Sequence, residues 1–126
     1  MSSKQFFAVF FGGAIGALSR WGILELLPTI THWPWHIVLI NISGSAALGV
    51  MVGLFTRSRD SLLFLAVGGG FCAAFTTFSS FTVEIASTIK TQEYFDAVSF
   101  LTASIVGGFA AYQMGKHVGN PNKAAL

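Results

Sequence analysis

The sequence predicts an all-α membrane protein with four transmembrane helices per chain, the third of them broken in mid-membrane. Of its 126 residues, 53% are hydrophobic and only 10% are charged, whereas a soluble domain carries roughly 25% charged residues. Four apolar stretches have lengths near the roughly 20 residues that span a bilayer. We therefore expect a single transmembrane domain, residues 1–126, with spans near 6–27, 35–55, 62–89 and 97–115.

Small residues recur at helical spacing in the first two spans. Gly12 and Gly16 lie four residues apart in the first span, and Gly49 and Gly53 do so in the second. Residues four apart share one face of a helix, and small residues on that face let helices approach closely in lipid. We expect these glycines to form helix–helix contacts.

The third span is too long for a straight crossing. Residues 62–89 would make a helix of about 42 Å at 1.5 Å per residue, against a hydrocarbon core of about 30 Å. Strong tilt is one solution and a break is the other. The run Gly68–Gly70 and the pair Thr76-Thr77 weaken helix locally. A break here would free backbone carbonyls at membrane depth, where they can bind cations.

The segment Gly70–Phe81 combines small residues, four hydroxyls and paired phenylalanines. Hydrocarbon offers these hydroxyls no partner, so they must be satisfied inside protein or along a wet path. This composition is typical of a pore lining rather than of a membrane anchor. Polar residues in a bilayer usually face a bundle interior or a cavity, and Arg20, Asn41 and Glu84 also lie within spans. Four helices enclose little space, so we expect an oligomer whose polar faces meet at the subunit boundary.

Basic residues are unevenly distributed. With four spans, both termini and the loop after the second span share one side, which holds Lys4, Arg57, Arg59, Lys116 and Lys123. The opposite side holds only Lys90, and Trp33, Trp35 and Tyr94 fall at that boundary. The positive-inside rule therefore predicts cytoplasmic termini and a multi-pass protein of the cell (inner) membrane.

Several function classes find no support. The motifs HExxH, CxxC and the P-loop are missing from the sequence, so we do not expect an enzyme, and we expect no nucleic-acid partner. His32, His36 and His117 are scattered near the span ends, which favours interfacial positions over metal binding.

Four short motifs carry a resemblance to a known family, the Fluc (CrcB) fluoride channels, along essentially the whole chain. The family's third-span motif GxxGGxTTFSTF reads GFCAAFTTFSSF from Gly70 to Phe81, and its FSxE continuation reads FTVE from Phe81 to Glu84. The second-span motif VNxxG reads INISG from Ile40 to Gly44, and the first-span motif GxxxRW reads GALSRW from Gly16 to Trp21. Each motif alone is weak, but four in order at the family's spacing are highly specific.

The resemblance implies an antiparallel dimer with two narrow pores along the subunit interface. It implies that Phe78 and Phe81 line the pores, where their ring edges, which carry positive partial charge, hold an anion weakly. The alternative is core packing, the role that most of the 13 phenylalanines must have. It also implies a central structural Na⁺ held by the backbone carbonyls of Ala73 and Thr76. The family's glycine pair is Ala73-Ala74 here, which matters if the break needs a positive φ, because alanine resists that conformation.

The resemblance assigns further polar roles, each beside a structural alternative. Asn41 would donate its amide N–H to the anion, or else join two helices by a hydrogen bond. The hydroxyl track along the pore would comprise Ser79, Ser80, Thr82 and Ser104. Glu84 would stand near the pore end or else at the interface. Arg20 would attract anions in a vestibule, or else cap carbonyls or pair with Glu25 or Glu84. Three family donors are replaced, at Ile37, Phe100 and Gly108.

The expected function is passive export of fluoride from the cytoplasm, driven by the membrane potential. One alternative is a small multidrug-type, proton-coupled transporter that uses Glu25, and another is a non-conducting partner subunit of a heterodimeric channel. The inverted partner is either a second copy or a paralogue. The skew of basic residues indicates one fixed orientation, which favours a paralogue.

Overall fold

The computed structural model describes residues 1–27 and 33–120, and the regular secondary structure in these ranges is helical, without strands. His32 and Lys123, which entered the sequence argument, lie outside the described residues. The elements are α1 (Ser3–Leu26), α2 (Trp35–Leu54), α3 (Leu62–Phe64), η1 (Leu65–Cys72), α4 (Ala73–Phe75), α5 (Ser79–Lys90) and α6 (Tyr94–Gly119). Four helical segments are long and apolar enough to cross a membrane: Ser3–Leu26, Trp35–Leu54, Leu62–Lys90 and Tyr94–Gly119. The predicted all-α class with four such helices is confirmed.

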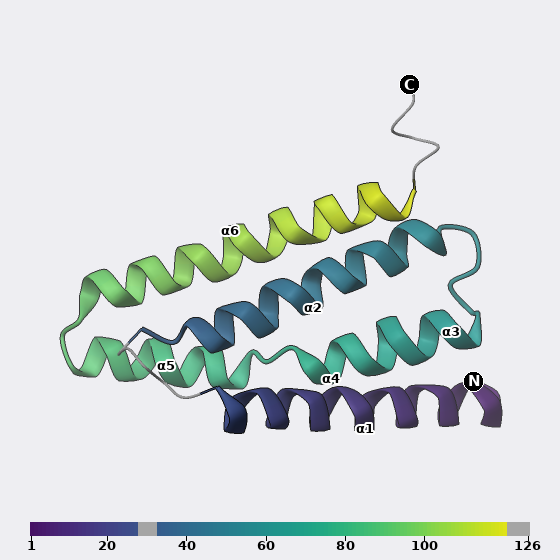
Figure 1. Ribbon diagram of the computed structural model, residues 1–126, viewed down its shortest axis with the longest axis horizontal. Helices are drawn as coiled ribbons and strands as arrows, with labels where there is room; N and C mark the ends of the chain where they lie inside the picture. Colours follow the sequence, from purple (N-terminus) through teal and green to yellow (C-terminus); the bar gives the residue numbers. More distant parts are fainter. Residues whose placement is uncertain (28–32, 121–126) are drawn as a thin grey trace.

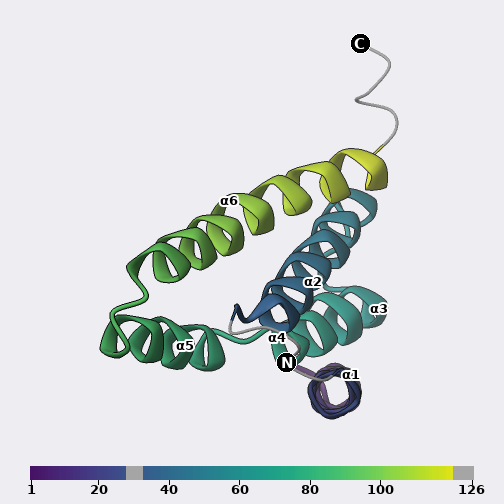
Figure 2. The ribbon, with the colours of Figure 1, turned by 60° about the vertical axis from the view of Figure 1, so that its left-hand side comes forward.

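The helices lie roughly side by side in the order α6, α2, third helix, α1, as two views of the chain show (Figures 1 and 2). The start of α1, the connection from α2 to α3 and the end of α6 lie at one end of the bundle (Figure 1). The turn from α5 to α6 lies at the other end. Lys4, Arg57, Arg59 and Lys116 therefore gather at one end, and Lys90 stands at the other.

Helices α2 and α6 form the closest pair, and glycines make this approach possible. A Cβ added to Gly53 would lie 2.5 Å from the Lys116 carbonyl oxygen, and one added to Gly49 would meet the Tyr112 carbonyl oxygen. Gly115 and Gly119 of α6 face the α2 backbone in return. The predicted packing role of the α2 glycines is confirmed, with a matching glycine pair on α6 that the sequence argument did not use.

Helix α1 packs in the same way against η1. Cβ atoms on Gly12 and Gly16 would meet the carbonyl oxygens of Ala66 and Phe71. In return, a Cβ on Gly70 would lie 2.6 Å from the Val9 carbonyl oxygen. The backbones of α1 and η1 are therefore in contact, which holds the first half of the third helix beside α1.

The third helix is interrupted where the hydroxyl pair predicted a break. Helix α4 ends at Phe75, Thr76 is extended with φ −70° and ψ 158°, and α5 begins at Ser79. Figure 1 shows this extended link between α4 and α5. The glycine run Gly68–Gly70 lies within η1, a π-helix, which the sequence argument did not predict.

The break needs no left-handed residue. Ala73 has φ −65° and ψ −37°, and the only non-glycine residue with positive φ in the described ranges is Gln92, at 63°. The concern that alanine would strain the backbone at the family's glycine pair is thus answered, because both alanines keep helical conformations.

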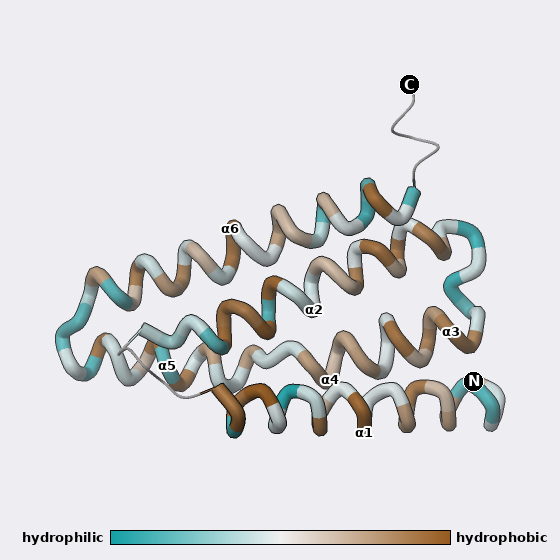
Figure 3. Tube along the Cα trace, in the orientation of Figure 1, coloured by the Kyte–Doolittle hydropathy of each residue, from teal (hydrophilic) through white to brown (hydrophobic). Residues whose placement is uncertain are grey.

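The buried core is small and joins α2, α5 and α6. Ile37, Val38 and Phe100 form its centre, with Phe81 and Ile85 packed against them. By contrast, α1 is rich in apolar residues along its length (Figure 3), and most of its large hydrophobic side chains, such as Phe10, Leu18 and Trp21, are exposed. Such a surface suits a lipid surrounding rather than water.

Candidate functional site

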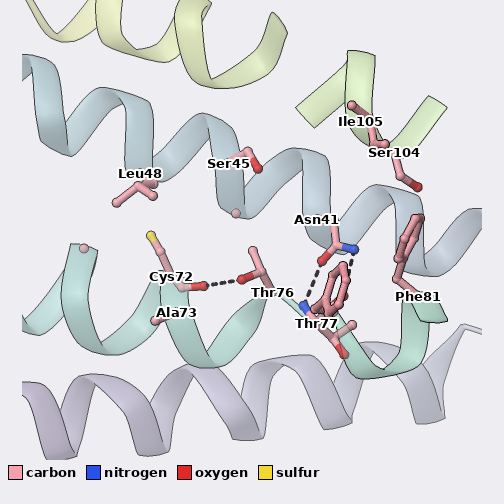
Figure 4. A pocket seen from close by; sticks show the side chains of 13 residues that line it. Asn41, Ser45, Leu48, Cys72, Ala73, Thr76, Thr77, Phe81, Ser104 and Ile105 are labelled. Atoms are coloured by element: carbon pink, nitrogen blue, oxygen red, sulfur yellow. Dashed lines mark hydrogen bonds between the residues drawn. The ribbon is translucent and has the colours of Figure 1, made fainter. Parts of the chain in front are cut away.

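A cavity of about 360 Å³ lies beside the break of the third helix. Figure 4 shows it between α2, the third helix and α6. It brings together six of the predicted site residues: Asn41, Ala73, Thr76, Phe78, Phe81 and Ser104. Arg20, Ser79, Ser80, Thr82 and Glu84 do not line it. No charged side chain is among its lining residues in the described part of the chain, so polar contact within the cavity comes from amide, hydroxyl and backbone groups.

Asn41 binds the backbone of the break through both ends of its amide. Its Oδ1 accepts the N–H of Thr77 at 2.8 Å, and its Nδ2 donates to the Thr77 carbonyl at 3.0 Å. These two bonds satisfy backbone groups that the interrupted helix leaves without helical partners. The Asn41 NH₂ group carries two hydrogens, so one donor is left for another acceptor.

Arg20 reaches the adjacent residue of the break. Its Nη1 donates to the Thr76 carbonyl at 3.1 Å across 56 positions of sequence. Within the described residues, Glu25 and Glu84 form no ion pair with Arg20. The carbonyl-capping alternative for Arg20 is thus observed, although its charge still lies beside the cavity.

Thr77 connects the break to the start of α5, and its side chain is only 4% exposed. Its Oγ1 accepts the N–H of Ser80, in the first turn of α5, at 3.1 Å. The same oxygen donates to the Ser80 hydroxyl at 3.0 Å and lies 3.2 Å from the Ser79 hydroxyl. The Thr82 hydroxyl donates to the Ser79 carbonyl at 2.9 Å. These hydroxyls therefore form a local hydrogen-bond network at the start of α5.

Phe78 and Phe81 stack on each other, with ring centroids 5.8 Å apart. Their surroundings differ, because Phe78 is 77% exposed whereas Phe81 also packs on the fully buried Phe100, at 5.2 Å between centroids. One ring is therefore anchored in the core and holds the other at the open edge of the cavity. Phe100, at the position of a replaced family tyrosine, fills core space.

Ser104 contributes a buried hydroxyl to the cavity lining. Its Oγ is buried and has no hydrogen-bond partner among the described residues. Ser104 and Phe81 are seen on the same side of the cavity in Figure 4. A buried unpaired hydroxyl is uncommon in native structures, so it marks a place where a ligand can accept a hydrogen bond.

Sequence reasoning missed Thr77 and Ser45 as lining residues. The signal for Ser45 was present, because it lies four residues after Asn41 on the same helix face. The sequence argument used Thr77 only to locate the break. Its hydrogen bonds to Asn41 and Ser80 depend on the extended conformation of the preceding residue, Thr76.

The carbonyls predicted to hold Na⁺ are released from the helix. Thr77 donates its N–H to Asn41 rather than to the Ala73 carbonyl four residues earlier, and the Thr76 carbonyl accepts from Arg20. A carbonyl oxygen has two lone pairs, so Thr76 keeps one. No cluster of His, Cys, Asp or Glu suited to a metal occurs in the described ranges. Backbone carbonyl oxygens are hard ligands of the kind that suit Na⁺. The positive charge of Arg20, which bonds to the Thr76 carbonyl, would repel a cation there.

Comparison with known proteins places the chain in a family. The model of the family described as CrcB-like protein, Camphor Resistance (CrcB), matches residues 7–116. The chain belongs to the CrcB family. The expected resemblance is thereby confirmed, and with four membrane-crossing helices this CrcB protein is a multi-pass membrane protein.

Similar proteins carry a common name. The chain is 36% identical to "Fluoride-specific ion channel FluC 2" of Bacillus licheniformis, over 92% of this chain and 87% of the relative. It is 36% identical to "Fluoride-specific ion channel FluC" of Hyphomonas neptunium, over 87% and 91%. It is 33% identical to "Fluoride-specific ion channel FluC 2" of Streptococcus pneumoniae, over 92% and 98%. These relatives are named as channels and not as enzymes.

Proposed function

We propose that this CrcB protein is a fluoride-selective ion channel and not an enzyme, with the cavity beside the helix break forming half of a conduction path. The observation that carries the proposal is the combination of the Phe78/Phe81 pair with the unpaired Ser104 hydroxyl around an uncharged cavity. The names of the relatives support fluoride as the permeating ion.

The lining suits a small anion that must enter and also leave. Aromatic ring edges carry positive partial charge, and the second Asn41 hydrogen and the Ser104 hydroxyl can donate hydrogen bonds. Conduction requires binding that replaces water without trapping the ion. A lysine or arginine side chain lining the cavity would bind the anion more tightly. A lining without such a charged side chain therefore favours release of the ion and rapid conduction.

A second, inverted chain would complete the path. The polar groups that line the cavity need protein or water around them at membrane depth, and the cavity is open at the edge where Phe78 is 77% exposed. A partner covering this edge would enclose two such cavities along the interface. The partner is a second copy or a paralogue, and a Na⁺ at the centre would be held by the Ala73 and Thr76 carbonyls of both chains.

Export would be passive. The channel would lie in the inner membrane of the cell, with both of its termini in the cytoplasm. The membrane potential supplies about 2.3 kcal/mol per charge per 100 mV, which drives an anion out of a cell that is negative inside. This proposal needs no nucleotide site, in keeping with the missing P-loop motif.

The test is efflux from proteoliposomes that contain the purified chain. We expect rapid fluoride efflux in the presence of a potassium ionophore, and chloride efflux no faster than from empty vesicles. Equal rates for the two anions would reject fluoride selectivity. Absence of flux in both cases would support a non-conducting partner subunit.

The multidrug-transporter alternative depends on Glu25. This residue is exposed in the last turn of α1 and does not line the cavity. We expect Glu25→Gln to leave fluoride efflux unchanged. Proton-coupled uptake of a cationic dye by the parent chain, lost in this variant, would favour the transporter instead.

The sodium proposal has a separate test. Prolonged dialysis against N-methylglucamine should lower the thermal stability of the purified dimer, and added Na⁺ should restore it. Thr76→Ser keeps the carbonyl and should respond in the same way. Proline at Thr77 removes the N–H that Asn41 accepts and should abolish the response. A parent protein indifferent to Na⁺ would reject the site while leaving the pore proposal standing.

A further inference from the structure

A second polar hollow, of about 320 Å³, lies at the end of the bundle where α2 and α6 end. We call it the basic pocket, and its polar lining consists of Thr56, Arg59, Gln113, Lys116, His117 and Asn120. It shares no residue with the cavity beside the break. Every one of these polar side chains can donate a hydrogen bond, and no carboxylate is among the lining residues of the described ranges.

The pocket is built by the close contact of two helices. A Cβ on Gly53 would lie 2.5 Å from the Lys116 carbonyl oxygen, so the ends of α2 and α6 converge and their side chains surround one space. Thr56 is held there by its hydroxyl, which donates to the Gly53 carbonyl at 2.8 Å. The Arg59 guanidinium lies 5.9 Å from the centroid of the Phe64 ring, which keeps it near the pocket.

Helix dipoles explain only part of this composition. Lys116 and His117 occupy the last turn of α6, where positive charge is favourable. Arg59 belongs to the connection between α2 and α3, outside any helix, so this explanation does not cover it. Gln113 and Asn120 are neutral, so they cannot offset the negative end of a helix dipole, yet they add hydrogen-bond donors to the pocket. The whole set matches an anion with several acceptor oxygens, such as a phosphate.

The location of the basic pocket favours a lipid headgroup as the source of that phosphate. The pocket lies at the ends of two membrane-crossing helices, the depth at which headgroups are found. Apolar residues that neighbour the lining residues along α2 and α6 are exposed, with Leu54 at 60%, Met114 at 69% and Val118 at 71%. These side chains offer acyl chains an apolar surface at the same end of the two helices, which a soluble phosphate would not use.

We propose that the basic pocket binds the phosphate headgroup of an anionic phospholipid, with Arg59 and Lys116 as the two principal charges. Phosphatidylglycerol keeps a net negative charge, whereas phosphatidylcholine cancels its phosphate with a cationic choline. The pocket should therefore prefer the first lipid. This proposal is independent of the proposed anion conduction.

The test uses the purified full chain in mixed micelles, with lipid retention measured by native mass spectrometry. Phosphatidylglycerol should be retained in preference to phosphatidylcholine. The double variant Arg59→Gln, Lys116→Gln should lose roughly tenfold or more of this retention, because it removes the two principal charged donors that line the pocket and would bond to the phosphate. Fluoride efflux of the double variant should stay at the parent level in vesicles of phosphatidylcholine, which separates a failure here from a failure of the channel proposal.

The matched control is Arg57→Gln. Arg57 carries the same charge two residues away and does not line the pocket, so its loss should change retention by less than roughly twofold. Equal losses from Arg57→Gln would reduce the effect to general charge attraction and overturn the site. Displacement of phosphatidylglycerol by millimolar inorganic phosphate would reassign the pocket to a free phosphate. Circular dichroism of each variant checks that the helices are retained.

Discussion

At the scale of single residues, Asn41 and Phe78 differ in how firmly the rest of the chain holds them. Both amide ends of Asn41 bond to Thr77, so this side chain shapes the break and also keeps one hydrogen for an anion. Phe78 makes a ring contact with Phe81 and is otherwise largely exposed. Substitutions should therefore separate residues that hold the site from residues that meet the ion.

The phenylalanine pair gives the first prediction. Phe78→Ile and Phe81→Ile keep apolar bulk and remove the positive ring edge, and each should lower fluoride efflux about tenfold. A tenfold change in rate corresponds to about 1.4 kcal/mol, which is about the size of a single aromatic interaction. Efflux from proteoliposomes measures the effect. Normal efflux through both variants would assign the rings to packing.

Stability should distinguish the two variants. Phe78→Ile should change the free energy of unfolding of the chain itself by less than about 0.5 kcal/mol, because Phe78 is exposed within it. Phe81→Ile should cost about 1–2 kcal/mol, because Phe81 packs on the buried Phe100. Thermal unfolding in detergent provides this comparison.

Asn41 gives the second prediction. Asn41→Asp keeps an acceptor for the Thr77 N–H but places a second carboxylate oxygen against the Thr77 carbonyl, 3.0 Å from the present donor. We expect loss of efflux and a cost of about 1–3 kcal/mol for the unmade hydrogen bond. Asn41→Ser should be milder, since a hydroxyl can still donate.

A control on the same helix is Ser43→Ala. The Ser43 hydroxyl donates to the Leu39 carbonyl of its own helix at 2.7 Å and does not line the cavity, so its removal should leave efflux unchanged. Unchanged efflux in Asn41→Asp itself would remove Asn41 from the conduction path.

At the scale of elements, the glycine faces set which helices pair. Helix α1 offers a matched comparison, because a Cβ on Gly16 would meet the Phe71 carbonyl oxygen whereas one on Gly22 has nothing within 4 Å. Gly16→Ala should destabilise the protein by about 2 kcal/mol or more through overpacking. Gly22→Ala should be neutral or stabilising by up to about 1 kcal/mol. Equal unfolding temperatures for the two variants would contradict the close α1–η1 contact.

The third helix shows how local weakness and long-range support combine. The pair Thr76-Thr77 and the excessive span length were enough to predict the break, and it was found there. The π-helical form of η1 was not predicted, since glycine run and hydropathy look the same in an α-helix and a π-helix. Backbone contact with α1 at Gly12 and Gly16 is a tertiary effect that no local pattern contains.

At the scale of the whole molecule, the two ends differ in charge, and this predicts topology. We expect Thr91→Cys to react with an impermeant maleimide in intact cells and Ser2→Cys to be protected, because the basic end should stay in the cytoplasm. The parent chain serves as the control, since its single cysteine, Cys72, is only 2% exposed. Equal labelling at both positions would show dual insertion and favour a homodimer over a paralogue partner.

The sequence by itself determined the number of spans, the distribution of charge and the location of the break, because length, hydropathy and hydroxyl content are properties of contiguous segments. Its motifs also indicated the family, and with it six of the residues that line the cavity. Only the tertiary structure decided which groups satisfy the broken helix. Asn41 and Thr77 are 36 positions apart, and Arg20 and Thr76 are 56 apart, so their pairing depends on how glycine contacts align the helices. The same packing leaves Ser104 without a partner and gathers the basic pocket, since hydrogen-bond partners are chosen by distance in space and not by spacing along the chain.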